Sequence, residues 1–350
     1  MKSIVLTGGG TAGHCIPNLA LIPFLKEKFN KIYYIGSENG IERNLVKDFT
    51  IEYFPISCAK FRRKICFENI KIPFNLLKGI KEVSKILDKI KPNVIFSKGG
   101  YVALPTVFAA HKKGIPVISH ESDLTIGLAN KLTSRYCDKV LTSFEETANK
   151  LKNGVHVGPP LRNSLFNVDV TKSLKILGLE GKKPILLIMG GSQGATTINH
   201  FVRACLPHLL EKFEVLHVCG KNNLQEIKAK GYYQFEYLNN IEHAFSIASV
   251  CVTRGGSNSL FELLSQKIPC VVIPLPNGVS RGDQILNAKY FQSKSLVNVL
   301  LQEDLCVSTL LKQIFETYNN RKDIIKRIEE FKIENACPKI AKIIFETINI

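Results

Sequence analysis

Two glycine-rich segments carry the residue pattern of an anion-binding site. Residues 8–14 read GGGTAGH and residues 189–195 read MGGSQGA, and each follows an apolar run that opens one half of the chain. Glycine lets an anion approach the backbone closely, and a helix that starts after such a turn adds free N–H groups and partial positive charge. The pair therefore favours binding of a phosphate or diphosphate over two purely structural turns.

The first segment ends in a residue suited to proton transfer. His14 is expected at the start of a helix, where the positive helix end disfavours imidazolium and keeps the ring able to accept a proton. The alternative is that His14 only hydrogen-bonds the loop or a phosphate, and the residues alone leave both open. Glu121 is a competing base or an orienting partner, and the neighbouring His120 can equally be structural.

A third segment repeats the pattern of a strand followed by glycines and a helix. Residues 253–264 read TRGGSNSLFELL, and Ser257 is placed to cap the helix. Glu262 falls one to two turns into that helix. Its carboxylate either faces solvent or accepts hydrogen bonds from sugar hydroxyls.

The residues fit poorly both with an oxidoreductase that uses a nicotinamide cofactor and with an enzyme that depends on a metal ion. Gly8, Gly10 and Gly13 can be aligned with a dinucleotide fingerprint, yet no acidic residue closes the next apolar run, and Glu38 lies beyond a glycine. No Asp-x-Asp stands at a strand end, and no His/Asp cluster has ligand spacing. We expect no obligatory metal, because loop amides, helix dipoles and Arg162 can stabilise a diphosphate instead.

Short apolar runs alternate with helical patterns along the whole chain. Runs of Ile, Val and Leu separated by helices predict parallel sheets covered on both faces, so each half is expected to be a doubly wound α/β domain. Strands are expected near residues 3–7, 31–36, 93–97, 116–120, 139–143, 184–190, 214–220, 249–253 and 269–275, and a long helix over 76–90.

Length and chain-breaking residues predict two domains. A chain of 350 residues suits two domains of roughly 100–200 residues each, and Gly-Pro-Pro at 158–160 breaks regular structure. We expect an N-terminal domain over 1–160 and a C-terminal domain over 161–325. Residues 326–350 are expected to form a charged amphipathic helix that can pack back on the first domain.

Composition narrows the class of protein. Hydrophobic residues make up 45% of the chain, but no apolar run reaches the roughly 18 residues of a membrane span, and the start does not resemble a signal peptide. The ten cysteines lack a CxxC spacing and are expected to be buried free thiols. The net charge of +17 indicates an anionic partner, but no nucleic-acid signature is present, so nucleic acid is not expected.

One compact basic cluster stands beside apolar residues. Residues 60–64 read KFRRK, and basic and apolar residues interleave up to about residue 80. Such a segment predicts contact with an anionic membrane surface, with ordinary core packing as the alternative. The apolar residues concerned are Phe61, Ile65, Phe67, Ile72, Phe74 and Leu77.

Seven motifs occur in the order and spacing of one enzyme family. They are GGGTAGH at 8–14, SKGGYVALP at 97–105, HESDLTIGLANK at 120–131, GPPLR at 158–162, MGGSQGA at 189–195, TRGGSNSLFE at 253–262 and SRGDQILNA at 280–288. Through them the chain resembles the MurG family, the N-acetylglucosaminyltransferases that make lipid II from lipid I. The resemblance implies a GT-B fold, in which two Rossmann-like doubly wound domains face a central cleft.

The resemblance also implies roles for single residues on the donor side. Arg162 and Ser192 would contact the nucleotide diphosphate, Leu238 would offer backbone contacts to uracil, and Gln284 would contact the donor sugar. Glu262 would accept hydrogen bonds from the ribose hydroxyls. The substrate-binding stretch would comprise Ser257, Asn258, Ser259, Leu260, Phe261 and Glu262.

On the acceptor side, the resemblance makes His14 the candidate general base. Thr11, Ala12 and Gly13 would face the donor sugar and the acceptor. Ala12 replaces a glycine of the family's commonest loop, which is tolerable if its φ is negative. Asp123 stands where some members have an asparagine, so it lacks the amide donor and adds negative charge.

The activity implied is an inverting transfer of N-acetylglucosamine from UDP-N-acetylglucosamine to the 4-hydroxyl of the muramyl sugar of undecaprenyl-linked lipid I. It needs no cofactor and takes place at the cytoplasmic face of the membrane. UDP-N-acetylglucosamine 2-epimerases and diacylglycerol glycosyltransferases share the fold and are alternatives, disfavoured by GGYVALP and HESD. A UDP-sugar-binding protein without catalytic activity is a further alternative.

Overall fold

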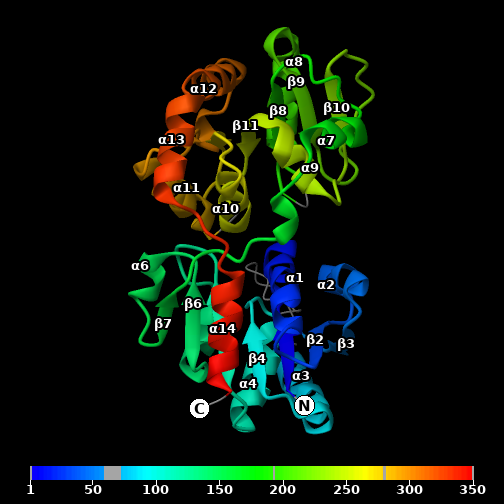
Figure 1. Cartoon of the computed structure of the whole chain (residues 1–350), viewed down its shortest axis with the longest axis vertical. Helices are drawn as coiled ribbons and strands as arrows, with labels where there is room; N and C mark the ends of the chain where they lie inside the picture. Colours follow the sequence, from blue (N-terminus) through cyan, green and yellow to red (C-terminus); the bar gives the residue numbers. More distant parts are fainter. Residues whose placement is uncertain (1, 59–71, 192–193, 279–280, 349–350) are drawn as a thin grey trace. The chain divides into compact units, whose positions relative to one another are not determined.

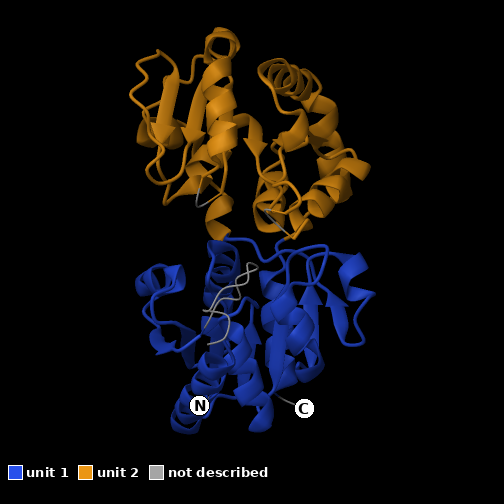
Figure 2. Cartoon of the chain, turned by 180° about the vertical axis from the view of Figure 1, so that it is seen from behind, with its two compact units in different colours: residues 1–162, 335–350 blue, residues 163–334 orange. Residues whose placement is uncertain are grey.

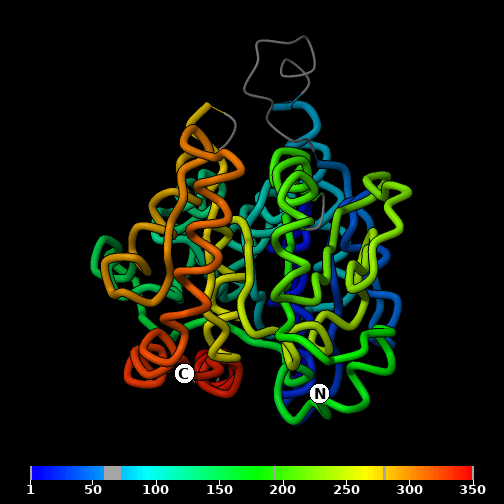
Figure 3. Tube along the Cα trace, turned by 90° about the horizontal axis from the view of Figure 1, so that it is seen from above, coloured from blue at the N-terminus to red at the C-terminus, as the bar shows by residue number. Residues whose placement is uncertain are grey.

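The computed structural model describes residues 2–58, 72–191, 194–278 and 281–348. The chain divides into two compact units (Figures 1 and 2). Unit 1 comprises Met1–Arg162 and Asn335–Ile350, and unit 2 comprises Asn163–Glu334. Both chain ends therefore belong to unit 1, and Figure 3 follows the trace between them.

Unit 1 is built on a parallel sheet of seven strands in the order β3-β2-β1-β4-β5-β6-β7. The register places Leu6 of β1 between Tyr34 of β2 and Phe96 of β4. The strands are β1 (Ser3–Thr7), β2 (Lys31–Ser37), β3 (Glu52–Ile56), β4 (Val94–Ser97), β5 (Val117–Glu121), β6 (Lys139–Thr142) and β7 (Gly154–His156).

Helices cover both faces of this sheet because both faces are apolar. Ile4 and Leu6 pack into one core with residues of α1 and α14, whereas Val5 packs into a second core with residues of α3 and α4. This alternation is the period of two that an extended strand imposes. The helices of unit 1 are α1 (Ala12–Lys26), α2 (Ile41–Val46), α3 (Ile72–Ile90), α4 (Ala103–Lys112), α5 (Leu128–Thr133), α6 (Glu145–Ala148) and α14 (Cys337–Thr347).

Unit 2 repeats the design with six parallel strands in the order β10-β9-β8-β11-β12-β13. Leu186 and Ile188 of β8 pack with residues of α8 and α12 in one core. The strands are β8 (Ile185–Met189), β9 (Glu214–Val218), β10 (Tyr232–Phe235), β11 (Ala248–Thr253), β12 (Cys270–Val272) and β13 (Asn298–Val299). The helices are α7 (Val170–Leu177), α8 (Thr196–Lys212), α9 (Ile241–Ile247), α10 (Ser257–Ser265), α11 (Asp283–Ser293), α12 (Val307–Asn319) and α13 (Arg321–Phe331).

The two doubly wound α/β domains expected from the sequence are confirmed, and every expected strand is present. The structure adds β3, β7, β10 and β13, which the sequence analysis missed. These four strands are the outermost strands of the two sheets, and they are short or carry polar residues and proline. Strands at a sheet edge need not be apolar on both faces, so their sequences lack the continuous apolar run.

The end of the chain differs from the single helix expected over 326–350. Two helices are present, and Lys332 adopts a left-handed conformation between them with a φ of +51°. The chain re-enters unit 1 at Asn335, whose Oδ1 accepts a hydrogen bond from Leu161 N at 3.0 Å. Helix α14 then packs on α1, with Phe345 edge-on to Phe29 at 6.3 Å between ring centroids. Unit 2 consequently ends at residue 334 rather than at 325.

Candidate active site

The order in which the chain adds strands reverses at equivalent points of the two sheets. In unit 1 the chain builds outwards from β1 through β2 to β3, and then returns to the other side of β1 with β4; in unit 2, β8 and β11 stand in the same relation. Ligands of doubly wound sheets bind outside the carboxyl ends of the strands at such a switch point. The glycine segments that follow β1 and β8 begin at these ends, as the sequence analysis expected.

In unit 1, a buried carboxylate holds the first glycine loop. Glu42 of α2 has no exposed surface, and its Oε2 accepts a hydrogen bond from Gly10 N at 3.0 Å. Its Oε1 accepts from Ser37 N at 2.9 Å, and also from the Ser37 hydroxyl. Because a carboxylate already occupies the Gly10 N–H, this loop offers less to a phosphate than its glycines indicate. Glu42 was not predicted from the sequence as part of this loop, and it lies 32 residues beyond Gly10.

The half-buried His14 is the third residue of α1, and the residue that follows β4 fixes its ring orientation. Its Nδ1 lies 3.1 Å from the carbonyl oxygen of Lys98. A carbonyl oxygen can only accept, so a neutral ring carries its proton on Nδ1 and its lone pair on Nε2. Gly100 leaves room for the ring, since a Cβ there would lie 3.1 Å from His14 Cδ2. The arrangement suits a general base that accepts a proton at Nε2.

Beside His14 in the first loop, the expected contact residues share the start of α1. Thr11 is its N-cap and is exposed, Ala12 is its first residue, and Gly13 is half-buried. Ala12 is absent from the non-glycine residues with positive φ, so the alanine fits as the sequence analysis expected. Asp123 lies half-buried after β5, at the same edge of the sheet.

Glu121 at the end of β5 is buried and accepts three hydrogen bonds. They come from Asp123 N at 3.1 Å, Gly127 N at 2.8 Å and Asn130 Nδ2 at 2.9 Å. These bonds fold the turn after β5 around the carboxylate. Of the two roles left open by the sequence, the geometry favours the orienting partner over the base.

His120 is fully buried, and burial lowers its pKa well below its usual range. Its Nε2 lies 3.3 Å from the carbonyl oxygen of Gly158. Within the described part of the chain its Nδ1 has no hydrogen-bond partner. These contacts link β5 to the segment after β7, which supports the structural explanation of His120.

In unit 2, several of the expected donor residues lie in segments that follow the carboxyl ends of strands. Gly194 closes the second loop with a φ of +75° and donates to Gly191 O at 2.9 Å. Ser192 lies outside the described residues. Leu238 is half-buried in the segment between β10 and α9. Arg162 is half-buried at the last position of the first segment of unit 1, so it belongs to the other unit.

The third loop differs from the sequence interpretation at its cap. The N-cap of α10 is Gly256 and not Ser257, which is the first helical residue and is buried. Glu262 lies half-buried on the same helix, and the rest of the predicted stretch, Asn258, Ser259, Leu260 and Phe261, forms its first turns. Glycine is one of the residues preferred at an N-cap, and Gly256 takes that position here, so Ser257 falls one position later.

Two further side chains brace this loop. Arg254 is 7% exposed, and its Nη1 donates to Ile273 O at 3.0 Å; burial lowers the pKa of its guanidinium to about 10. Arg254 is not among the site residues predicted from the sequence. Gln284 of α11 accepts a hydrogen bond at its Oε1 from Leu275 N at 3.1 Å, which fixes the side chain beside Gly255.

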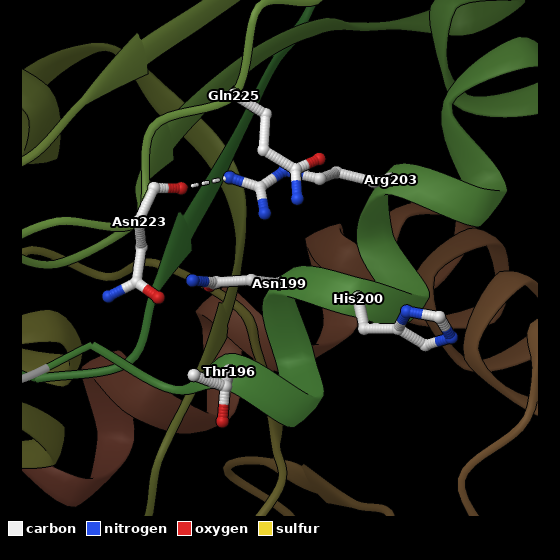
Figure 4. A pocket seen from close by; sticks show the side chains of 6 residues that line it. All are labelled: Thr196, Asn199, His200, Arg203, Asn223 and Gln225. Carbon is white, nitrogen blue, oxygen red and sulfur yellow. Dashed lines mark hydrogen bonds between the residues drawn. The ribbon is translucent and has the colours of Figure 1, made fainter.

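A polar pocket lies beside α8 in unit 2 (Figure 4). Arg203 crosses it and donates to the carbonyl oxygen of Asn223, and its Nη2 also donates to Gln234 Oε1 at 3.1 Å. These bonds connect α8 to the segment after β9 and to β10. The lining residues are Thr196, Asn199, His200, Arg203, Asn223 and Gln225.

Over the described residues, no three His, Cys, Asp or Glu side chains converge as metal ligands would. None of the helices described there combines the length and apolarity needed to cross a bilayer. The expected site residues that the structure describes come from both units, for example His14 from unit 1 and Glu262 from unit 2.

Comparison with known proteins covers almost the whole chain. The model of the glycosyltransferase family 28 N-terminal domain matches residues 4–142, and that of the family 28 C-terminal domain matches residues 185–343. The UDP-N-acetylglucosamine--N-acetylmuramyl-(pentapeptide) pyrophosphoryl-undecaprenol N-acetylglucosamine transferase of Clostridium botulinum (strain 657 / Type Ba4) is 45% identical over 349 residues, covering 98% of this chain and 99% of that protein. The enzyme of the same name from Clostridium tetani is 44% identical over 348 residues, 98% of this chain and 97% of that protein.

Solved structures agree on the fold. The crystal structure of MurG from Acinetobacter baumannii has a TM-score of 0.76 at 23% identity and covers 99% of this chain and all 100% of that one. A UDP-GlcNAc 2-epimerase from Neisseria meningitidis has a TM-score of 0.68 at 15% identity, with 100% of both chains covered. At these identities the likeness concerns the fold alone, and the sequence relationship decides the family. With both family 28 domains matched and relatives at 45% identity along its whole length, the chain belongs to the MurG family of glycosyltransferases.

Proposed function

We propose that this chain transfers N-acetylglucosamine from UDP-N-acetylglucosamine to the 4-hydroxyl of the muramyl sugar of undecaprenyl-linked lipid I, which gives lipid II. The observation that carries the proposal is the 45% identity, over 98% of the chain, to a transferase named for this reaction. The residues at the carboxyl edges of the two sheets supply the groups that such a transfer needs. These are a base for the acceptor hydroxyl and donors for the leaving nucleotide.

We propose His14 as the general base. The Lys98 carbonyl holds the proton of the neutral ring on Nδ1 and leaves the lone pair on Nε2. Nε2 then takes the proton of the acceptor hydroxyl as its oxygen attacks the anomeric carbon, and the bond from that carbon to the diphosphate breaks on the opposite face. One displacement of this kind inverts the anomeric centre. Thr11, Ala12 and Gly13 are proposed to line the same site.

Glu121 is proposed as a positioning residue and Asp123 as a contact to substrate. Three donors hold the Glu121 carboxylate in the turn after β5, so the turn presents Asp123 at the edge where His14 lies. An aspartate accepts hydrogen bonds but cannot donate them as an asparagine does. We therefore expect Asp123 to meet a hydroxyl or amide donor of the substrate rather than a phosphate.

The donor nucleotide is proposed to bind at the edge of unit 2. Gly194 and Ala195 precede the N-terminus of α8, whose free N–H groups favour the diphosphate, and Ser192 and Arg162 are proposed to contact it. Glu262 is proposed to accept hydrogen bonds from the ribose hydroxyls. Leu238 is proposed to contact uracil through its backbone, Gln284 to contact the sugar, and residues 257–261 to complete the pocket.

Contact with the cytoplasmic face of an anionic membrane is proposed for the N-terminal part of α3. Phe74 and Leu77 are 71% and 64% exposed and lie three positions apart, so they share one face of the helix, next to Lys78. Ile72 is half-buried. The basic cluster 60–64, Phe61, Ile65 and Phe67 lie outside the described residues. Exposed apolar side chains beside cations are the pattern of a helix that lies in a membrane interface.

The test is transfer of radiolabelled N-acetylglucosamine to a lipid I analogue by the full-length protein and by His14→Ala. We expect transfer by the wild-type chain and a loss of about 10²–10⁴-fold in kcat for the variant, the usual contribution of a general base. Binding of the UDP-sugar should stay unchanged, because His14 is proposed to act on the acceptor hydroxyl and not on the nucleotide. Epimerisation of the UDP-sugar without transfer would refute the proposal in favour of the epimerase alternative.

A further inference from the structure

Lys98 is a buried cation that no role proposed above uses. It directly follows β4 and is 1% exposed, which places it among the largest fully buried side chains of the described chain. Lysine is almost never buried to this extent unless its ammonium group is paired. The residue therefore needs a physical explanation.

The ammonium group of Lys98 faces the turn after β5. Its Nζ donates to Ser122 Oγ at 2.6 Å. Burial lowers the pKa of Lys98 to about 8, and the nearby carboxylates of Glu121 and Asp123 oppose this shift because they attract the protonated form. Lys98 thus carries one positive charge close to two negative ones at neutral pH.

The backbone of Lys98 faces the first glycine loop. Its N–H donates to Thr7 O at 2.8 Å, and its carbonyl oxygen accepts a hydrogen bond from His14 Nδ1 at 3.1 Å. A Cβ added at Gly8 would lie 3.0 Å from Lys98 Cβ, so the two segments are in close contact. One residue therefore connects the proposed base with the turn that carries Asp123.

The charge at this edge matters because the acceptor is anionic. Glu121 and Asp123 with Lys98 sum to one negative charge, whereas without the ammonium group they sum to two. Asp123 supplies one of the two negative charges beside the ammonium group, so the balance depends on the residue at this position. A neutral asparagine at position 123 would remove one of the two negative charges.

We propose that Lys98 is a positioning residue whose ammonium group, bound to Ser122, balances the charge of Asp123 and holds the turn after β5 in place for an acceptor that carries a diphosphate. This inference rests on the proposed function. It makes Lys98 and Asp123 a matched pair, so that the effect of changing one depends on the other. The carbonyl of Lys98 stays in every side-chain variant, so the tautomer of His14 is not altered by the test.

The experiment compares the full-length wild type with Lys98→Met, Lys98→Arg, Asp123→Asn and the double variant Lys98→Met/Asp123→Asn. Steady-state kinetics give kcat and the KM for each substrate, and thermal unfolding gives the melting temperature. We expect Lys98→Met to raise the KM for the lipid-linked acceptor about tenfold and to change the KM for UDP-N-acetylglucosamine less than about twofold. In the Asp123→Asn background the same change should have an effect several times smaller, because the ammonium group then has no Asp123 carboxylate to balance and the effects of interacting residues are not additive.

The pH profile is a second readout that a merely structural role would not move. The charged groups around the Lys98 ammonium group are Glu121, Asp123 and, when protonated, His120. His14 is hydrogen-bonded to the carbonyl oxygen of Lys98. As the pH rises through about 8 the ammonium group loses its proton, so wild-type activity toward the acceptor should fall there. Lys98→Arg keeps its charge at higher pH, and this decline should move upward.

Equal effects of Lys98→Met in the two backgrounds, or wild-type kinetics and pH profile in Lys98→Met, would overturn the inference. If Lys98→Met does not fold, the other two variants test the inference. It is wrong if the decline of activity at alkaline pH does not shift in Lys98→Arg. It is also wrong if the added Asp123→Asn change does not restore folding in the double variant. Absence of transfer by the wild type refutes the proposed function instead. In that case the melting temperatures of the variants test the coupling between Lys98 and Asp123. If the losses in melting temperature of the two single variants add up to that of the double variant, the two residues are not coupled and the inference is wrong.

Discussion

The buried carboxylate of Glu42 should be essential to the first glycine loop, and Glu42→Gln tests this. The carboxylate accepts from Gly10 N at 3.0 Å and from Ser37 N at 2.9 Å, as well as from the Ser37 hydroxyl. A glutamine keeps one oxygen, but its amide group must face one of the two backbone N–H groups, donor against donor. A hydrogen bond to a charged group is worth about 1.5–3 kcal/mol, and an unsatisfied buried donor costs about 1–3 kcal/mol.

From these magnitudes we expect Glu42→Gln to lower the free energy of unfolding by about 2–4 kcal/mol, counting one lost bond and partial relaxation. A domain of this size loses roughly 2–4 °C in melting temperature per kcal/mol, so the expected drop is roughly 4–16 °C. Turnover should fall as well, because the loop precedes His14. Urea and thermal unfolding of the full-length chain measure the first effect, and the transfer assay measures the second.

Glu38→Gln is the matched control, since Glu38 is exposed one position after Ser37. It should leave the melting temperature and the turnover within error of the wild type. If Glu42→Gln behaves like Glu38→Gln, the loop does not depend on this carboxylate, and the account of the loop given above is wrong.

Three further predictions follow from the site. Gly100→Ala should reduce turnover more than Gly114→Ala. Both glycines have positive φ, +78° and +64°, but of the two only at Gly100 would a Cβ lie against a carbonyl oxygen, at 2.7 Å. Equal turnover of the two variants would contradict the role of that close approach. Phe74→Ser/Leu77→Ser should weaken sedimentation with anionic vesicles, while Ile176→Ser, 60% exposed in unit 2, should not; equal sedimentation of both variants would speak against membrane contact through α3. Transfer should persist in EDTA, and loss of activity that Mg²⁺ restores would contradict a metal-free mechanism.

The central strands could be predicted from the sequence because their physical cause is local. A strand such as β1 or β8 is buried on both faces, so it must be a short continuous apolar run, and such runs are visible without any partner. The glycine segments after them are equally visible, because positive φ at positions such as Gly10 and Gly194 demands glycine. Edge strands such as β3, with Pro55 and Glu52, escape this reasoning because only part of their surface is buried.

The side chains that hold the site together were not visible in the same way. Glu42, Lys98 and Arg254 look like ordinary surface charges in a chain with 47 Lys and Arg and 30 Asp and Glu residues. Their burial follows from contacts with segments that lie far away in the sequence, such as Lys98 with Ser122 and with the loop of His14. No local pattern distinguishes a buried charge from a solvated one, since the compensating groups come from other strands.

The sequence by itself determined the family, the two doubly wound domains and the segments that form the carboxyl edges of the sheets, because local composition and motif order encode them. Tertiary structure decided which nitrogen of His14 holds the lone pair, which role Glu121 is shaped for, and where unit 2 ends. Each of these depends on a hydrogen bond or a packing contact between distant segments: His14 with Lys98, Glu121 with Asn130, and Asn335 with Leu161. Such contacts arise only when the chain folds, so the order of residues along the chain does not reveal them.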